Sequence, residues 1–156
     1  MLTELKRKEV YKYNNDYMTR KLGVHGLVQN KSGLYLVLKR SEQDIDEGNC
    51  WDPIGGGIEE GESIEEGFKR EAMEEGGIGV NSIQVTYAYT DEDNGLQLIV
   101  SAKTNDEIVN LSPEHNEYKW IKFEEIKTIN PVSLHLKAIQ YMLKNGVYMV
   151  KYEDYK

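Results

Sequence analysis

The chain has 156 residues and a formal net charge of −8. This length fits one domain with its own core, so we expect a single domain over residues 1–156. The acidic balance disfavours a nucleic-acid partner, and no apolar run approaches the roughly 18 residues of a membrane span. The single cysteine, Cys50, excludes an intramolecular disulfide, and the N-terminus lacks the apolar stretch of a signal peptide. We therefore expect a cytoplasmic protein.

The sequence of the first third of the chain predicts mainly β structure. Residues 1–22 are charged and hold three tyrosines around an Asn-Asn-Asp turn signal, so we expect an N-terminal extension or hairpin there. Residues 23–29 and 33–39 are β-prone runs separated by the turn sequence Asn-Lys-Ser-Gly, which predicts an antiparallel pair. Residues 40–50 are polar and acidic and indicate a surface loop leading to Trp51. The Trp51 ring either stacks on a base or closes the core.

A capped helix is predicted after the glycine-rich loop at residues 55–61. Ser63 and Glu66 have the spacing of a capping box, in which each side chain satisfies a backbone N–H group at the helix start. Gly76 and Gly77 can end the helix. Apolar residues at four-residue spacing give it a buried stripe of Ile64, Phe68 and Ala72.

Three acids of this helix stand close together. Glu71, Glu74 and Glu75 are spaced i, i+3 and i+4, which predicts that their carboxylates share one face, on the side opposite the apolar stripe. Each like-charge pair at this spacing costs a few tenths of a kcal/mol, so a cation among them is favoured. Mg²⁺ prefers such oxygen ligands and is commonly shared with substrate phosphates. Arg70 can pair with Glu74 one turn on and orient that carboxylate.

The spacing of these residues resembles a family signature. Gly56, five residues, Glu62, seven residues and then Arg70-Glu71-Ala72-Met73-Glu74-Glu75-Gly76-Gly77-Ile78 is similar to the motif of the Nudix hydrolases, which cleave nucleoside diphosphates linked to another moiety. The chain departs from the usual pattern at Ile54, where members commonly carry proline, and at Ala72, where a bulky aliphatic residue is usual.

The resemblance implies roles for the motif residues. One to three Mg²⁺ ions, for which Mn²⁺ can substitute, would be held by Glu74 and Glu75 and by the carbonyl oxygen of Gly55. Glu71 would be a further ligand or the base that orients water. Glu62 and Arg70 would support these ligands from beside the site.

The second half of the chain alternates strands and helices. Strand-like runs at 80–90 and 96–104 are joined by a turn containing Asn94-Gly95, a strong hairpin signal. A third run at 117–123 is followed by a short helical piece at 123–129 and a last helix at 133–145 that Gly146 ends. The apolar face of that helix is predicted to consist of Leu134, Ala138, Ile139 and Met142.

Glu114 is a further candidate. The segment Pro113 to Trp120 looks like a family segment in which such a glutamate, on a loop opposite the helix, supplies an extra metal ligand or the general base. His115 and Glu117 are rival candidates for this role, and a loop acid is otherwise a solvated group.

Strands interrupted by two helical segments indicate an α/β fold with a mixed sheet covered on both faces. The resemblance, which spans about residues 20–145, implies the α/β/α sandwich of the Nudix family. It also implies a nucleotide substrate.

Three functions remain open. The first is a nucleoside triphosphate pyrophosphatase, including one for oxidised nucleotides, which the compact length and the segment from Glu114 to Trp120 favour. The second is a hydrolase of ADP-ribose, nucleotide sugars or dinucleoside polyphosphates, although residues 91–95 carry neither the proline nor the tyrosine typical of two of those classes. The third is a nucleotide-binding module without catalysis. A homodimer is left open.

Overall fold

The computed structural model describes residues 20–156, and the predicted N-terminal extension or hairpin lies almost entirely outside the described residues. Eight strands in this part of the chain form one mixed sheet in the order β3-β2-β1-β6-β5-β8, with β4 also paired to β1 and β7 to β2. The elements are β1 Leu22–Gln29, β2 Tyr35–Arg40, β3 Trp51–Asp52, β4 Ile54–Gly57, α2 Ile64–Gly76, β5 Asn81–Thr90, β6 Leu96–Lys103, β7 His115–Ile121, α3 Phe123–Ile126, α4 Leu134–Asn145, β8 Met149–Val150 and α5 Tyr152–Tyr155.

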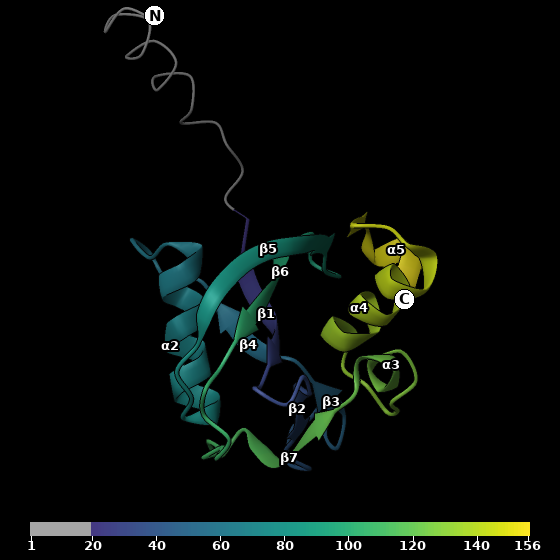
Figure 1. The fold of residues 1–156 in the computed structure, drawn as a ribbon. Coiled ribbons are helices and arrows are strands. Elements are labelled where there is room, and N and C mark those ends of the chain that lie inside the picture. Colours follow the sequence, from purple (N-terminus) through teal and green to yellow (C-terminus); the bar gives the residue numbers. More distant parts are fainter. Residues whose placement is uncertain (1–19) are drawn as a thin grey trace, which may run out of the picture.

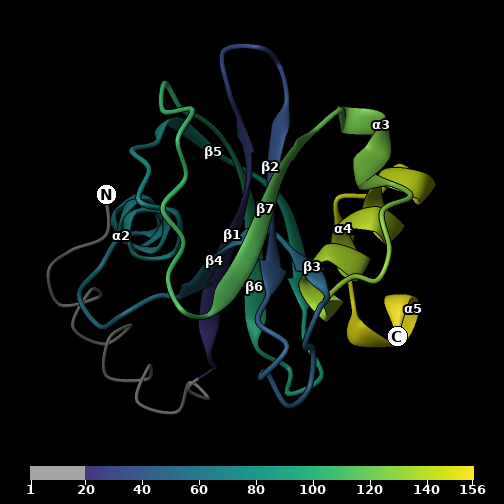
Figure 2. The same ribbon diagram turned by 90° about the horizontal axis from the view of Figure 1, so that it is seen from below.

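The sheet separates two helical layers. Helix α2 covers one face, and α3, α4 and α5 lie on the other (Figures 1 and 2). Strand β1 shows why both faces are buried: Val24 and Val28 join the core under α2, whereas Leu27, on the opposite face of the strand, joins the core under α4. The predicted α/β/α sandwich with a mixed sheet is confirmed.

Strand β1 does not have the neighbours that its position in the sequence suggests. It is antiparallel to β2 as predicted, but the two strands share only the pair Gln29 and Tyr35. Along its whole length β1 is parallel to β6, and its first half is antiparallel to β4 on the other edge. Strand β2 instead pairs with β7. A short turn predicts neighbours in sequence, whereas the burial of β1 on both faces and both edges requires distant partners.

Helix α2 begins and ends as predicted. The Ser63 hydroxyl accepts from the Glu66 N–H at 3.1 Å, and the Glu66 carboxylate accepts from the Ser63 N–H at 2.8 Å, which completes the capping box. Gly77 ends the helix in the left-handed conformation with φ 60°. The helix ends are therefore set by local sequence.

The glycine-rich stretch at 55–61, predicted as a loop, begins as strand β4. Residues Ile54 to Gly57 pair with Gly23 to Gly26 of β1, and the loop proper starts only at Ile58. Glycine is a weak strand former, so its sequence does not reveal the pairing. The result is that the first motif glycines are fixed in the sheet rather than free in a loop.

The remaining predicted elements are present with small shifts. Strands β5 and β6 form the predicted hairpin, and Asn94 adopts the positive φ of 59° that the turn requires. The predicted strand at 117–123 begins earlier, at His115, and the predicted helical piece ends at Ile126. On α4, Leu134 is only half buried, while Leu136 and Gln140 are buried beside the predicted Ala138, Ile139 and Met142.

Strand β8 and helix α5 complete the α4 side and have no counterpart in the sequence prediction. Two residues of β8 run parallel to β5, with Ala88 beside Met149. The Tyr155 ring packs edge-on against the Tyr89 ring, and its hydroxyl donates to the Thr90 carbonyl oxygen at 2.8 Å. Among the described residues, no helix combines the length and the apolarity that crossing a bilayer requires.

Candidate active site

Arg70 connects the loop before α2 to the acids of the helix. Its guanidinium donates to both carboxylate oxygens of Glu62, at 2.6 and 3.1 Å, and to the carbonyl oxygen of Gly57 at 2.8 Å. It also donates to Glu71 at 2.8 Å and to Glu74 at 3.2 Å. These five bonds equal the number of N–H donors on a guanidinium, so Arg70 has none left for a substrate. Its role is to hold the carboxylates in place.

The Arg70 network reduces the repulsion that is expected from the spacing of the acids. The sequence pattern attributes the relief of acid repulsion to a metal, but Arg70 already offsets part of it at Glu71 and Glu74. The same guanidinium lowers the pKa of Glu62 through its hydrogen bond. Glu75 is different, because it is absent from the contacts of Arg70. The case for a cation therefore rests mainly on Glu75.

Glu75 is a buried carboxylate without a full set of partners. Its side chain is only 8% exposed, and within residues 20–156 its Oε2 atom has no hydrogen-bond partner. Burial, followed by the charges of Asp52, Glu71 and Glu114, raises its pKa to about 9, against the opposing effect of a hydrogen bond with the Gly55 backbone. A buried anion among other anions is favourable only when a cation accompanies it.

The three acids do not share one face in the way that their spacing predicts. Glu75 follows Phe68 by seven residues and Ala72 by three, so it lies on the buried stripe of α2 rather than opposite it. The Glu71 side chain, at 12% exposed, flanks this stripe, whereas that of Glu74 is 58% exposed. The prediction that one side of the helix packs and the other binds is therefore wrong for Glu75, which faces the sheet.

Glu71 lies against the backbone of the first motif glycines. Burial raises its pKa, as do the charges of Glu74 and Glu114, while the Arg70 hydrogen bond opposes the rise. A β-carbon at position 56 would stand 2.5 Å from the Glu71 carboxylate, so any other residue there requires that carboxylate to shift. At Gly55 the φ of 149° and the proximity of the Val24 carbonyl oxygen exclude a side chain.

The loop before β7 brings Glu114 to the same place. Its carbonyl oxygen accepts from the Ser41 N–H at 2.8 Å, and its exposed carboxylate is close enough to raise the pKa values of Glu71 and Glu75. The rival Glu117 forms an ion pair with Lys39 at 3.3 Å on the strand surface. The rival His115 is buried. The structure therefore gathers Gly55, Glu62, Arg70, Glu71, Glu74, Glu75 and Glu114 at one site.

Asp52 and His115 lie beside these acids; the sequence marked His115 only as a rival of Glu114 and gave Asp52 no role. Asp52 accepts from the Ser133 hydroxyl at 2.5 Å and from Arg40 at 3.0 Å. Burial would raise the pKa of Asp52, but the nearby His115 imidazole, the charges of two further histidines and the Ser133 hydrogen bond lower it to about 2. Its position three residues before the motif glycines was the only signal, and Asp at that place is also common in turns.

The described residues fit a divalent cation without forming a finished coordination shell. In residues 20–156, no three His, Cys, Asp or Glu side chains converge as ready-made ligands. However, Oε2 of Glu75 is buried and unpartnered, and Glu71 and Glu114 add negative charge beside it. These oxygen donors match the preference of Mg²⁺, which keeps several waters in place of protein ligands.

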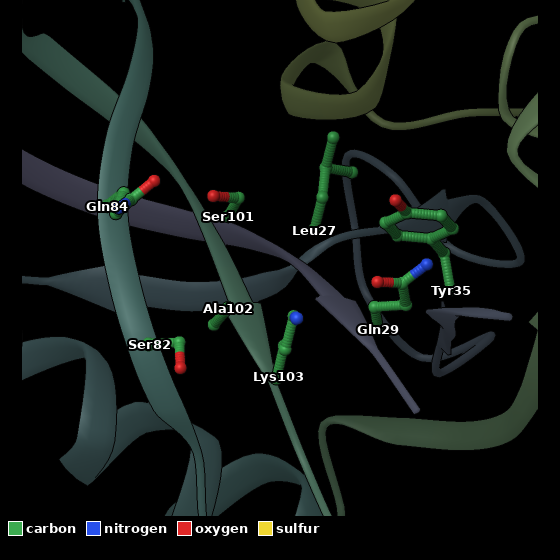
Figure 3. A pocket seen from close by; sticks show the side chains of 8 residues that line it. All are labelled: Leu27, Gln29, Tyr35, Ser82, Gln84, Ser101, Ala102 and Lys103. Carbon is green, nitrogen blue, oxygen red and sulfur yellow. The ribbon is translucent and has the colours of Figure 1, made fainter. Parts of the chain in front are cut away.

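Cavities also lie away from these acids. One, of about 350 Å³, is lined by Leu27, Gln29, Tyr35, Ser82, Gln84, Ser101, Ala102 and Lys103 (Figure 3). It lies at the far end of β1 from the motif glycines, and no carboxylate lines it. Another, of about 140 Å³, lies at the start of α4 and is lined by Glu47, Tyr89, Asp91, Glu92, Asp93, Leu134, His135 and Tyr155.

Of the two roles considered for Trp51, stacking on a base or closing the core, the structure supports the second. It is 5% exposed and belongs to the core on the α4 side of the sheet. The ammonium group of Lys119 lies 4.8 Å from its ring centroid, which adds a cation–π contact. A base therefore has no free Trp51 face on which to stack.

This combination is typical of the Nudix class of proteins: an α/β/α sandwich in which the glycine-rich strand β4 and the capped, acidic helix α2 face the loop that carries Glu114. Comparison with known proteins agrees: residues 19–141 match the NUDIX domain. This chain belongs to the Nudix hydrolase family. The share of the chain that matches exceeds three quarters, so the family assignment covers α2, most of α4 and every strand of the sheet except β8.

Individual relatives are similar to the chain over most of their length. A nucleoside triphosphatase NudI from Salmonella schwarzengrund is 30% identical over 133 residues, which are 75% of this chain and 94% of that protein. A NUDIX hydrolase from Nitrosomonas europaea has a TM-score of 0.70 at 18% identity, covering 86% of this chain and 80% of that one. The NUDIX domain of Shewanella oneidensis NrtR, solved with ADP-ribose, has a TM-score of 0.64 at 16% identity, covering 94% and 100%.

Proposed function

We propose that the chain hydrolyses nucleoside triphosphates, oxidised ones included, to a nucleoside monophosphate and pyrophosphate, with Mg²⁺ required and Mn²⁺ able to replace it. The observation that carries this proposal is the buried, unpartnered carboxylate of Glu75 beside Glu71 and the Glu114 loop. The choice of triphosphates is supported by the similarity to a nucleoside triphosphatase at 30% identity.

The protein groups assigned to the ion are Glu75, Glu71 and the Gly55 carbonyl oxygen, with Glu74 on the exposed side and Glu114 on the facing loop. When bound, the ion neutralises charge on the phosphate oxygens and lowers the pKa of water. Arg70 supports the site without touching substrate, because its donors are engaged with Glu62, Glu71, Glu74 and Gly57.

The chemical step is a substitution at phosphorus. The water oxygen forms the new bond to phosphorus while the anhydride bond breaks, and pyrophosphate departs with the bond's electron pair. Glu71 or Glu114 accepts the proton of the attacking water. Glu71 is suited to this task because burial raises its pKa toward neutrality, which makes the carboxylate a better base than an exposed one.

A substrate panel tests the proposal. Triphosphates, oxidised triphosphates, ADP-ribose, sugar nucleotides and dinucleoside polyphosphates are each incubated with Mg²⁺, and phosphate is measured after coupling enzymes. We expect kcat/KM to be highest for a triphosphate and EDTA to abolish turnover. Turnover that survives complete chelation contradicts the metal requirement.

ADP-ribose is the second candidate substrate, because the similar NrtR domain was solved with ADP-ribose and aligns with 94% of this chain. A clear preference for ADP-ribose, a sugar nucleotide or a dinucleoside polyphosphate replaces triphosphates as the substrate class. Binding without turnover across the whole panel favours a non-catalytic nucleotide-binding module.

A further inference from the structure

His115 lies between two carboxylates that come from different layers of the fold. Its Nδ1 atom is 3.8 Å from Oε2 of Glu75 on α2, and its Nε2 atom is 3.6 Å from Oδ2 of Asp52 on β3. Its side chain is 1% exposed, and neither ring nitrogen has a closer partner among the described residues. Hydrogen bonds of this kind are about 2.7–3.0 Å long, so movements of roughly 1 Å close both contacts. An imidazole that donates to both carboxylates carries a proton on each ring nitrogen.

Hydrogen bonds hold the Asp52 side of this arrangement. Asp52 is held by the Ser133 hydroxyl at the start of α4 and by Arg40 on β2. Arg40 is held in turn by Asp44, at 2.7 Å. The backbone of His115 is fixed as well, because its N–H donates to the Ser112 carbonyl oxygen and β7 pairs with β2. The imidazole therefore has one neighbour that is held by hydrogen bonds, Asp52, and one with an unpartnered oxygen, Glu75.

Glu75 needs such a neighbour. Its Oε2 atom is the carboxylate oxygen without a partner, and it is the atom that Nδ1 of His115 faces. Carboxylates and imidazoles that bind metals are commonly oriented by a hydrogen bond from a residue behind them. Arg70 performs this task for Glu71 and Glu74 from the solvent side, but it does not reach Glu75.

We propose that His115 is a positioning residue, which bridges Asp52 and Glu75 and holds the Glu75 carboxylate in the orientation that binds the divalent cation. This proposal rests on the proposed function, in which Glu75 is a metal ligand. His115 itself touches neither substrate nor metal. Its effect is on how well Glu75 is aimed, so metal affinity changes first and kcat changes through it.

Three variants of His115 test its contacts with Glu75 and Asp52 separately. In His115→Asn the amide nitrogen takes about the place of Nδ1 and can still donate to Glu75, whereas in His115→Gln the amide lies near the place of Nε2 and faces Asp52. His115→Phe keeps the buried ring and removes both nitrogens. Glu117→Gln, two residues on along β7 and exposed, is the matched control, because it removes only the surface pair with Lys39.

The readouts are Mn²⁺ affinity, from the signal of free Mn²⁺ in electron paramagnetic resonance, and kcat and KM at several Mg²⁺ concentrations. We expect His115→Phe to weaken Mn²⁺ binding on the order of 10-fold and to recover much of its kcat at high Mg²⁺. His115→Asn is expected to bind Mn²⁺ within about three-fold of wild type, and His115→Gln to fall between the two.

The results separate this proposal from the one it rests on. If His115→Phe and His115→Gln bind Mn²⁺ as tightly as the Glu117→Gln control while Glu75→Gln binds it weakly, the positioning role is wrong and the metal site stands. If Glu75→Gln also binds Mn²⁺ normally, the proposed metal site is wrong. If His115→Phe does not fold, the comparison of His115→Asn with His115→Gln decides, and equal Mn²⁺ affinity in those two overturns the proposal.

Discussion

At the scale of single residues, the surroundings of the motif glycines differ in whether they leave room for a side chain. A β-carbon at position 56 would collide with the Glu71 carboxylate, whereas one at position 57 would meet nothing within 4 Å. Both positions lie in β4 and have backbone angles open to other residues. The first glycine is therefore required by an acid, and the second is not required by its surroundings.

The Gly56→Ala change tests this reading. We expect it to push the Glu71 carboxylate aside and to lower kcat on the order of 10- to 100-fold, because small displacements of catalytic groups have effects of this size. Gly57→Ala is the control and should keep kcat within a few-fold. Steady-state kinetics on the best substrate, with thermal melting to confirm folding, measure both. Equal losses in the two variants would contradict the close contact.

Glu75 makes the metal-free protein sensitive to pH. Its folded pKa of about 9 lies well above the value of about 4.3 in an unfolded chain, so the folded state holds a proton that the unfolded state releases between these values. Its contribution to stability is complete below about pH 4 and is lost as pH rises toward 9, with a slope of at most about 1.4 kcal/mol per pH unit.

We expect Glu75→Gln to remove this dependence. In EDTA the variant should melt at a higher temperature than wild type at pH 8, and the two should agree at pH 5. Melting curves across pH 5 to 9 measure the difference, in which the contributions of other groups cancel. A wild-type protein that gains stability relative to the variant as pH rises would show that Glu75 is ionised without a metal.

At the scale of elements, α2 shows what its sequence could and could not predict. The capping residues predicted its ends, because Ser63, Glu66 and Gly77 act on backbone groups within a few residues. The orientation of the acids was not predictable from spacing, because the buried stripe continues from Phe68 through Ala72 to Glu75. Only the packing of α2 on β1 and β4 decides which acid turns inward.

The packing of α2 predicts which glutamate contributes most to kcat. We expect Glu75→Gln to cost on the order of 10²-fold or more in kcat, because the change removes the buried, unpartnered carboxylate that we propose as a metal ligand. Glu74→Gln should cost less than Glu75→Gln, since its side chain is mostly exposed and Arg70 remains paired with Glu62 and Glu71.

Glu65→Gln is the control for this series. Glu65 lies in the first turn and contacts Lys69 on the surface, so the change should leave kcat within a few-fold of wild type. Parallel kinetics at saturating Mg²⁺ give the order. A Glu75→Gln variant as active as Glu65→Gln would place the metal elsewhere.

Some strand pairings also follow from local sequence, whereas others depend on residues far apart in the chain. The β5–β6 hairpin followed from its Asn-Gly turn, but the parallel pairing of β1 with β6 joins residues more than seventy positions apart. No local pattern marks such a pairing. The site depends on it, because β1 carries β4, and β4 places the Gly55 and Gly56 backbone beside Glu71 and Glu75.

At the scale of the whole molecule, the site joins both layers through the sheet. Glu75 belongs to the α2 layer, whereas Ser133, which holds Asp52, begins a helix of the opposite layer. The seven site residues predicted from the motif and the Glu114 segment are near one another, yet the link through Asp52 and His115 was missed. A sequence motif contains only site residues that are close together in the chain. Site residues from distant parts of the chain become neighbours only through the fold.

Metal binding should stabilise the whole fold. Mg²⁺ at about 100 times its dissociation constant adds about 2.7 kcal/mol to the free energy of unfolding if the unfolded chain does not bind it. The effect should grow from pH 6 to pH 8, because binding must displace the Glu75 proton. Melting curves with Mg²⁺ or EDTA measure the gain, and Glu75→Gln should show little of it. An equal gain in the variant would indicate binding elsewhere.

The family match stops at residue 141, inside α4, but the structure continues to use the chain beyond that point. Val150 and Tyr155 are buried in the core that contains Tyr89, and Tyr155 bonds to the last residue of β5. The family match therefore ends before the core does. A chain cut at residue 141 would leave the Tyr89 ring without the side chains that cover it, so we expect such a truncation to lose stability and not merely a tail.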